Sequence, residues 1–206
     1  TLAGTIQTDG NAISIGDGGT AITLAADTTV DGNTAGAITL AGATNGGYSL
    51  TLNTTGTTTL SAEIGGSTAL TTLTTNASGT TVISVDITTS STQTYNDAVT
   101  VNGTLDFTGS TVQFASTVEG NDGTGDNLTI SGALDLDGAA TSLTTLTVEG
   151  ASNLGANVTT SGTQTYTGAV TLSGAARTLT TAGSAVTFSN TVNGAQDLTV
   201  DTNGTD

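Results

Sequence analysis

The 206-residue chain contains no Cys, His, Met, Pro, Trp or Lys, and these absences exclude many chemistries. Without Cys or His there is no disulfide, no zinc site of the usual kind and no imidazole base. The one cation, Arg177, faces 17 Asp and Glu residues, which gives a formal net charge of -16. Nucleic acid and anionic membrane surfaces are poor partners, because binding either requires several Lys or Arg. No apolar run approaches membrane-spanning length, so we expect no membrane insertion.

Threonine is the residue that the chain has in excess, with 52 copies alongside 29 Gly. Leu, Ile, Val and Phe make up only about a fifth of the residues, close to the level at which disorder becomes the default. The absence of Pro and the scarcity of Lys and Glu argue against disorder, since disordered chains usually carry these residues in quantity. The strict placement of the aliphatic residues argues against it as well.

The dominant pattern is a pair of apolar residues separated by one polar residue. Positions i and i+2 share a face in a strand but not in a helix, so the pairs predict short strands with one buried face. Turn-forming Gly and Asn residues lie between them. The pairs are Ile13/Ile15, Ile22/Leu24, Ile38/Leu40, Leu50/Leu52, Val99/Val101, Leu105/Phe107, Val112/Phe114, Leu128/Ile130, Leu134/Leu136, Leu146/Val148, Val170/Leu172, Val186/Phe188 and Leu198/Val200.

Five strand ends share the motif Thr-Val-[Asp/Asn/Glu]-Gly. Repetition of one motif predicts that one turn geometry is used five times. The copies are Thr29–Gly32, Thr100–Gly103, Thr117–Gly120, Thr147–Gly150 and Thr191–Gly194.

A longer repeat, with a period of about 70 residues, lies on top of the strand pattern. Its clearest copies lie at roughly 50–127 and 128–200. The segment Ile87–Tyr95 matches Val158–Tyr166, and Leu128–Ile130 matches Leu198–Val200. No charged or Pro-rich linker separates the copies. We therefore predict one continuous array over residues 1–206 rather than separate domains.

Two all-β architectures are compatible with this repeat. In a β-solenoid, coils of short strands stack so that apolar side chains form columns. In tandem immunoglobulin-like β-sandwiches, each unit closes a core of its own. Six aromatic residues are few for filling the ~10 Å gap of several sandwiches. The prediction is therefore a β-solenoid, with the tandem sandwiches as the alternative.

The repeated phrases resemble a known family. The Thr-Gln-Thr-Tyr of 92–95 and 163–166, followed by Val-x-Phe, Thr-Val-[Asn/Glu]-Gly and Leu-Thr-[Ile/Val], is similar to the β-strand-repeat proteins of bacterial surfaces. Those giant exoproteins are grouped with filamentous-haemagglutinin-like adhesins. The resemblance implies a right-handed parallel β-helix within a long secreted or cell-surface chain. It supplies no catalytic residues.

Two acidic features carry the candidate chemistry. Asp135 and Asp137 flank Leu136 on one strand face, the arrangement of a glycosidase carboxylate pair. They lack the aromatic platforms, His and basic residues found along the cleft of β-helix hydrolases, so we expect no enzyme and assign no catalytic residue. The loop 119–127 concentrates oxygen ligands and Gly as a Ca²⁺ loop does, with Asn121, Asp122 and Asp126 as the candidate ligands. No other cofactor is expected.

Most residues between the apolar pairs are Thr, which we expect on the outer surface. Regular Thr ladders on a β-solenoid suggest ice binding, although Thr is also favoured in any exposed strand because it is β-branched. The outward positions are Thr23, Thr39, Thr51, Thr100, Thr129, Thr147, Thr171, Thr187 and Thr199. Tyr48, Tyr95 and Tyr166 could stack on glycans, but the last two occupy equivalent repeat positions, which favours a structural role.

These observations predict a structural segment of an extracellular bacterial fibre or adhesin stalk at the cell surface. One alternative is a subunit of a self-assembling extracellular filament or surface layer. Another is an ice- or Ca²⁺-binding module. The expected partners are copies of the chain or neighbouring repeats placed end to end. The sequence does not identify a host-cell, glycan or other surface ligand.

Overall fold

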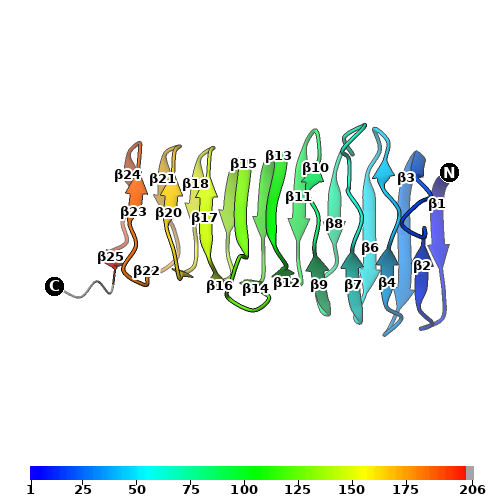
Figure 1. Ribbon diagram of the computed structural model, residues 1–206, viewed down its shortest axis with the longest axis horizontal. Helices are drawn as coiled ribbons and strands as arrows, with labels where there is room; N and C mark the ends of the chain where they lie inside the picture. Colours follow the sequence, from blue (N-terminus) through cyan, green and yellow to red (C-terminus); the bar gives the residue numbers. More distant parts are fainter. Residues whose placement is uncertain (203–206) are drawn as a thin grey trace.

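The computed structural model describes residues 1–202 and shows an all-β parallel solenoid with no helix among them. The strands stack along one long axis, with the N-terminus at one end and the last described strand at the other (Figure 1). Two sheets run the length of the molecule, one of 15 strands and one of 10. The predicted β-solenoid is therefore confirmed for the described residues, and positions 203–206 of the predicted array lie outside them.

The larger sheet has two arms, which we call A1 and A2. Arm A1 contains β1 (Leu2–Gln7), β6 (Leu50–Thr54), β8 (Leu73–Thr75), β11 (Thr92–Tyr95), β18 (Ser152–Leu154), β21 (Val170–Leu172) and β24 (Val192–Asn193). Arm A2 contains β5 (Thr44–Asn45), β10 (Ile87–Thr88), β17 (Thr145–Val148), β20 (Gln164–Tyr166) and β23 (Val186–Phe188). Three long strands contribute to A2 with their first half and to A1 with their second half: β3 (Ile22–Asn33), β13 (Thr104–Phe114) and β15 (Asn127–Leu136).

The smaller sheet, which we call B, contributes one strand to each coil. Its strands are β2 (Ile13–Ile15), β4 (Ile38–Leu40), β7 (Thr57–Leu60), β9 (Thr80–Ile83), β12 (Ala98–Val101), β14 (Val118–Gly120), β16 (Ala140–Leu143), β19 (Val158–Thr160), β22 (Arg177–Thr181) and β25 (Leu198–Asp201). A coil thus passes through A2, A1 and B in turn. The coils differ in length, because Leu146 pairs with Gln164 in a short coil whereas Ile13 pairs with Ile38 in a longer one.

All the paired strands among residues 1–202 run parallel, which decides between the two predicted architectures. Immunoglobulin-like sandwiches are built from antiparallel strands. The alternative of tandem sandwiches is therefore wrong for this chain.

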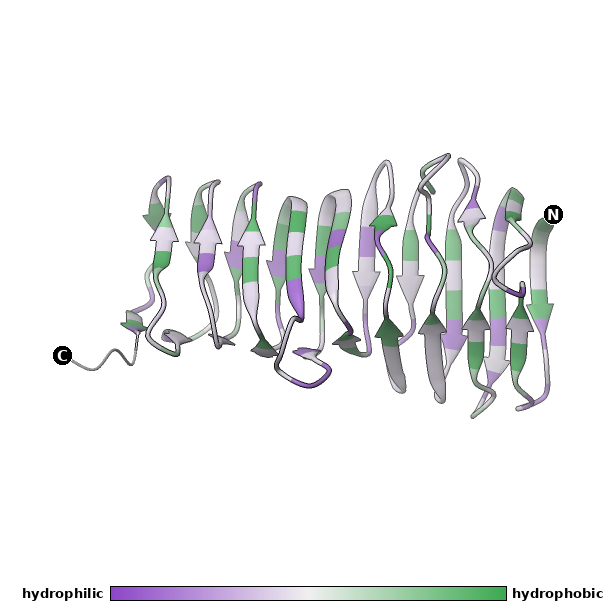
Figure 2. Cartoon of the chain, viewed as in Figure 1, coloured by the Kyte–Doolittle hydropathy of each residue, from purple (hydrophilic) through white to green (hydrophobic). Residues whose placement is uncertain are grey.

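The core follows the predicted apolar pairs. Within each strand buried residues alternate with half-exposed ones, as in the pattern of β6, and the inward side chains form one continuous cluster. Figure 2 shows the same alternation as bands of different hydropathy along single strands. In the last described coil, inward residues such as Val192 and Val200 become exposed. A thin column of Val, Ile and Leu is sufficient because each coil encloses a narrow interior.

The long sequence repeat does not coincide with a whole number of coils. Ile87 lies on arm A2, whereas its sequence equivalent Val158 lies on sheet B. Tyr95 lies on A1, whereas Tyr166 lies on A2. Equivalent residues of the two repeat copies therefore lie on adjacent surfaces of the coil rather than on the same one. Similar sequences thus form strands on different surfaces of the rod.

A column of glycines marks the corner where arm A2 meets arm A1. A Cβ atom added at Gly132 would lie 2.0 Å from the carbonyl oxygen of Gly109, and one at Gly150 would lie 2.3 Å from that of Gly132. Gly168 repeats this approach on Gly150, also at 2.3 Å. Backbones meet this closely only where no side chain intervenes. Glycine therefore allows the coils to stack at this corner.

The prediction of one turn geometry for the Thr-Val-[Asp/Asn/Glu]-Gly motif is wrong. Gly103 and Gly194 have positive φ angles of 106° and 136°, whereas Gly32, Gly120 and Gly150 do not adopt positive φ. The difference does not follow the surface, because Gly103 and Gly120 both lie at the end of a sheet B strand and only Gly103 has a positive φ. The same four residues therefore end a strand in more than one conformation.

Candidate functional site

Asp135 lies on the outside of β15 and Asp137 directly follows the end of that strand, with the buried Leu136 between them. The Asn153 amide donates a 2.8 Å hydrogen bond to Asp135 from the following coil. The Gln113 amide donates a 3.3 Å hydrogen bond to Asp137 from the preceding coil. Each carboxylate is thus paired with an amide of a different neighbouring coil, an arrangement that joins coils together.

The loop 121–126 lies between β14 and β15 and contains the candidate calcium ligands. Asp126 is buried, and its two oxygens accept backbone N–H hydrogen bonds from Gly103 at 2.8 Å and from Asp122 at 3.1 Å. Asp122 accepts hydrogen bonds from the backbone N–H and hydroxyl of Thr124, and the hydroxyl contact lowers its pKa. Asp126 therefore acts as an internal staple that fixes the loop to the preceding coil.

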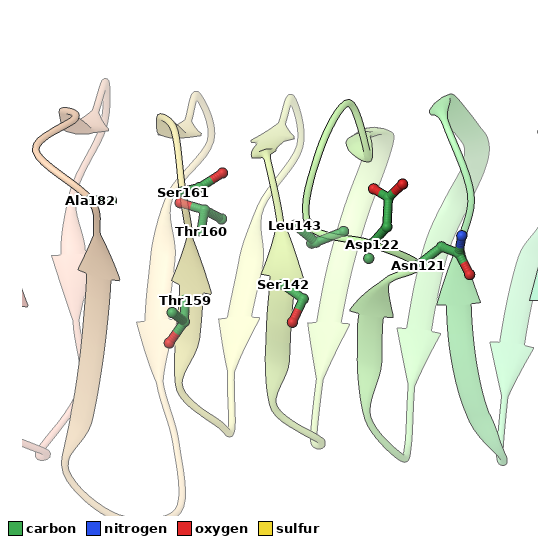
Figure 3. Close-up of a pocket in the computed structure, with 10 residues that line it drawn as sticks. Asn121, Asp122, Ser142, Leu143, Thr159, Thr160, Ser161 and Ala182 are labelled. Atoms are coloured by element: carbon green, nitrogen blue, oxygen red, sulfur yellow. The ribbon is translucent and has the colours of Figure 1, made fainter.

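This loop borders a depression of about 550 Å³ on the surface. Asn121 and Asp122 lie along one side, and Thr159, Thr160 and Ser161 lie on the other (Figure 3). Among residues 1–202, no three carboxylates gather closely enough to hold a metal ion. The calcium hypothesis for Asn121, Asp122 and Asp126 thus stays a prediction.

Asp97 is a buried acid that the sequence patterns did not single out. Its carboxylate accepts hydrogen bonds from the hydroxyls of Thr75 at 2.6 Å and Thr81 at 2.8 Å. Burial raises its pKa, and the two hydroxyl contacts oppose this rise. Burial, together with the charge of Asp97, also raises the pKa of Tyr95 well above its ordinary value. Asp97 links A1 and B of one coil to the next through buried hydrogen bonds.

Tyr95 and Tyr166 are fully buried, so the structural role predicted for them is confirmed. Tyr95 stacks on Phe114 with ring centroids 5.2 Å apart, and Tyr166 stacks on Phe188 at 5.4 Å. Tyr48, by contrast, is 42% exposed. Stacking on a glycan is therefore open to Tyr48 alone of the three.

Arg177 is buried and binds backbone carbonyls. Its guanidinium donates to the carbonyl oxygens of Leu154, Ser173 and Ala176. These oxygens belong to the turn between β21 and β22 and to the coil before it. The one cation of the chain thus stabilises a corner of the solenoid.

The Asp106 Oδ1 and the Ser152 hydroxyl are buried without a hydrogen-bond partner among the described residues. Burial raises the Asp106 pKa, the Ser131 hydroxyl bond opposes this rise, and Asp86 and Glu149 add to it. Among residues 1–202, neither atom belongs to a group of three or more acidic side chains that could hold a metal ion.

The predicted outward threonines are confirmed, because all nine are half-exposed or exposed. Many stack in register from coil to coil. On A1 the row runs Thr5, Thr29, Thr51, Thr74 and Thr94. On A2 it runs Thr129, Thr147, Thr165 and Thr187. These rows are the most regular polar feature of the surface.

Comparison of the chain with models of known protein families, with curated proteins and with solved structures finds no match. Within the described part of the chain, no helix has the length and apolarity needed to cross a membrane. The class of protein is thus defined by the fold alone, as a parallel β-solenoid with an acidic, Thr-rich surface.

Proposed function

We propose that this chain is a structural rod, a segment of an extracellular bacterial fibre or adhesin stalk without catalytic activity. The observation that carries the proposal is the continuous parallel pairing from β1 to β25 on all three surfaces of the coil. Ten coils with a rise of about 4.8 Å give a rod about 50 Å long. Backbone hydrogen bonds along the axis and a dry apolar core make such a rod stiff.

The acidic surface supports the same role. The net charge of -16 is spread over many coils, so neighbouring rods repel each other and exposed sheets do not aggregate. The buried polar groups described above join coil to coil, as Asp97, Arg177 and Asp126 do. Such contacts make the rod rigid along its length.

Localisation on intact cells of the source organism tests this proposal. Antibodies raised against the purified chain should label the outside of unpermeabilised cells, and external protease should remove the signal. Electron microscopy should then show the labelled material as thin extended fibres. Labelling only after permeabilisation, or labelling of compact particles, would contradict the proposal.

A second candidate function, the subunit of an end-to-end filament, is favoured by the two ends of the solenoid. At one end β1, β2 and the start of β3 present strand edges without a paired strand among residues 1–202, and at the other end β23, β24 and residues 198–200 of β25 do. The edges match surface by surface. The column that ends at Val200 begins at Ile13, and the column that ends at Phe188 begins at Ile22.

Stacking of like edges would continue every sheet and column into a second copy. Such a head-to-tail interface does not close on itself and produces an open filament. Sedimentation of the purified chain should show association that increases with concentration. Val200→Lys places a charge in the open end of a column and should abolish the association, whereas Val82→Lys, on the outer side of mid-rod strand β9, should not. A chain that stays monomeric would rule out this second function.

A further inference from the structure

The Thr row on arm A1 forms an unbroken ladder. Thr29, Thr51, Thr74 and Thr94 are direct partners across β3, β6, β8 and β11, and the register is continuous between them. Parallel neighbours are about 4.8 Å apart, so the hydroxyls repeat at that interval along the rod. Figure 1 shows these strands running side by side.

A second row lies beside the first. Thr92 and Thr111 are partners, and Thr72 precedes Leu73, which is the partner of Gln93. The pairs Thr72/Thr74 and Thr92/Thr94 therefore project from the same surface about 6.6 Å apart along their strands. Together the two rows make a two-dimensional array of hydroxyl and methyl groups at spacings set by the backbone.

The hydroxyls of this array are free. Thr51, Thr74 and Thr94 are half-exposed, and no side-chain hydrogen bond occupies them within the described part of the chain. Their strand neighbours point into the core, as Leu52, Leu73 and Tyr95 do. The rigid core holds the array in place, so little conformational entropy is lost when the array binds a ligand.

The array also lacks charge, which is unusual for a chain with a net charge of -16. On arm A1 the acids are Asp27 and Asp31 near one end and Asp135 and Asp137 further along. Between them, β6, β8, β11 and the second half of β13 contain no charged residue. The strongly hydrated carboxylates that would disturb an ordered water layer are absent from this stretch of the surface.

We propose that this Thr array, over β6, β8 and β11, binds the surface of crystalline ice. Ice presents water oxygens in a fixed lattice, and a flat array of hydroxyls at fixed intervals can bond to many of them at once. Each contact is weak, but a rigid array engages them simultaneously, and the total affinity rises with the number of rows. A flexible or charged surface would not gain in this way.

The A2 ladder provides a matched comparison. Thr147 occupies the same place in the sequence motif Leu-Thr-Thr-Leu-Thr as Thr74, but it lies on A2 with Glu149 two residues away on the same surface. The A2 row also continues into Asp106. The same substitution can therefore be made at Thr74 and at Thr147. At Thr74 it alters the uncharged array on A1, and at Thr147 it alters the A2 surface, which carries carboxylates.

The test is thermal hysteresis and ice recrystallisation measured with the purified 206-residue chain and two variants, Thr74→Lys and Thr147→Lys. Circular dichroism first verifies that both variants melt as the unchanged chain does. The unchanged chain should inhibit recrystallisation, Thr74→Lys should lower thermal hysteresis about fivefold or more, and Thr147→Lys should leave it unchanged. If Thr74→Lys does not fold, Thr74→Val, which exchanges only the hydroxyl for a methyl group, replaces it.

Three results would overturn the proposal. The first is an unchanged chain that neither shapes ice nor inhibits recrystallisation. The second is equal loss of activity in the Thr74 and Thr147 variants, since the effect would then not belong to A1. The third is an unchanged chain that self-associates but has no ice activity, together with a Thr74→Lys variant that no longer self-associates. This result would identify the array as a contact between copies of the chain.

Discussion

The phenol of Tyr95 donates a 2.9 Å hydrogen bond to the side-chain oxygen of Gln93 inside the core, and Tyr166 repeats this contact with Gln164 at 3.2 Å. The two pairs lie on different surfaces, A1 and A2. The amide of each Gln also donates to the carbonyl of the residue six positions earlier, Ile87 or Val158. The Gln-Thr-Tyr motif thus makes the same buried hydrogen bonds on either surface, with the Gln amide bridging to backbone carbonyls outside the motif.

Removing the Gln should therefore be costly. Gln93→Ala leaves the buried Tyr95 hydroxyl without its acceptor and removes the side-chain donor from the Ile87 and Thr108 carbonyls. The Thr108 carbonyl keeps only the backbone N–H of Thr89. We expect a loss of about 3 kcal/mol or more in the free energy of unfolding. Urea denaturation followed by circular dichroism measures it. Gln113→Ala, on the exposed side of β13, should change stability by about 0.5 kcal/mol or less. Equal losses in the two variants would contradict the assigned role.

The glycine column predicts a steric effect of position. Gly132→Ala places a methyl group against the carbonyl of Gly109, which backbone movement alone can relieve. We expect a loss of about 1 to 3 kcal/mol in stability. At Gly47 an added Cβ meets nothing within 4 Å, so Gly47→Ala should be neutral or slightly stabilising. Thermal melts of both variants check this, and a neutral Gly132→Ala would show that the coils do not stack closely at this corner.

Asp97 predicts a pH dependence with a definite sign. Its pKa is raised in the folded chain, so the folded state holds the proton more tightly than the unfolded state. Its contribution to stability is present in full below the ordinary Asp pKa of 3.8 and is lost as the pH rises through the folded value. Asp97 should therefore raise the melting temperature as the pH falls from neutral, and we expect Asp97→Asn to flatten this rise. Asp197→Asn, which removes one exposed charge, should leave most of that slope in place. An unchanged slope in Asp97→Asn would exclude this account.

Arg177 tests whether the one cation acts through geometry or through charge. Its fork of donors satisfies three backbone carbonyls. Arg177→Met should lower stability by about 1 to 3 kcal/mol, because the Ser173 and Ala176 carbonyls lose their guanidinium donors and the Leu154 carbonyl keeps only the Ser173 N–H. Arg177→Lys keeps the charge but not the planar fork, so it should recover only a small part. Full recovery in the Lys variant, measured by thermal melting, would mean that the charge alone matters.

The architecture could be predicted from the sequence because the apolar i, i+2 pairs specify which strand faces are buried. Paired residues such as Leu50 and Leu52 carry this information locally. The relation between repeat and coil could not be predicted, since it depends on the length of each turn, and that length varies from coil to coil. Tyr95 and Tyr166 are equivalent in sequence, yet their surfaces differ.

The burial of certain polar side chains could not be predicted from the sequence for a different reason. Gln93, Asp97 and Arg177 are of residue types that normally lie at the surface. Each is buried because a neighbouring coil supplies its hydrogen-bond partner, and that neighbour is known only once the coil length is known. The strict alternation that places Gln93 on the inward side of β11 was the one signal that could have found it.

The central claim is that the chain is a solenoid, in which the separation of two residues in one outward row is proportional to the number of coils between them. Distances between pairs of spin labels test this claim most directly. The chain has no Cys, so pairs of introduced cysteines are labelled cleanly. Thr29 shares one outward row on A1 with Gln113, Thr171 and Asn193, at four, seven and eight coil steps. The solenoid predicts backbone separations of about 19, 34 and 38 Å, rising in proportion to the number of coils. Distances that do not rise with coil number would contradict it.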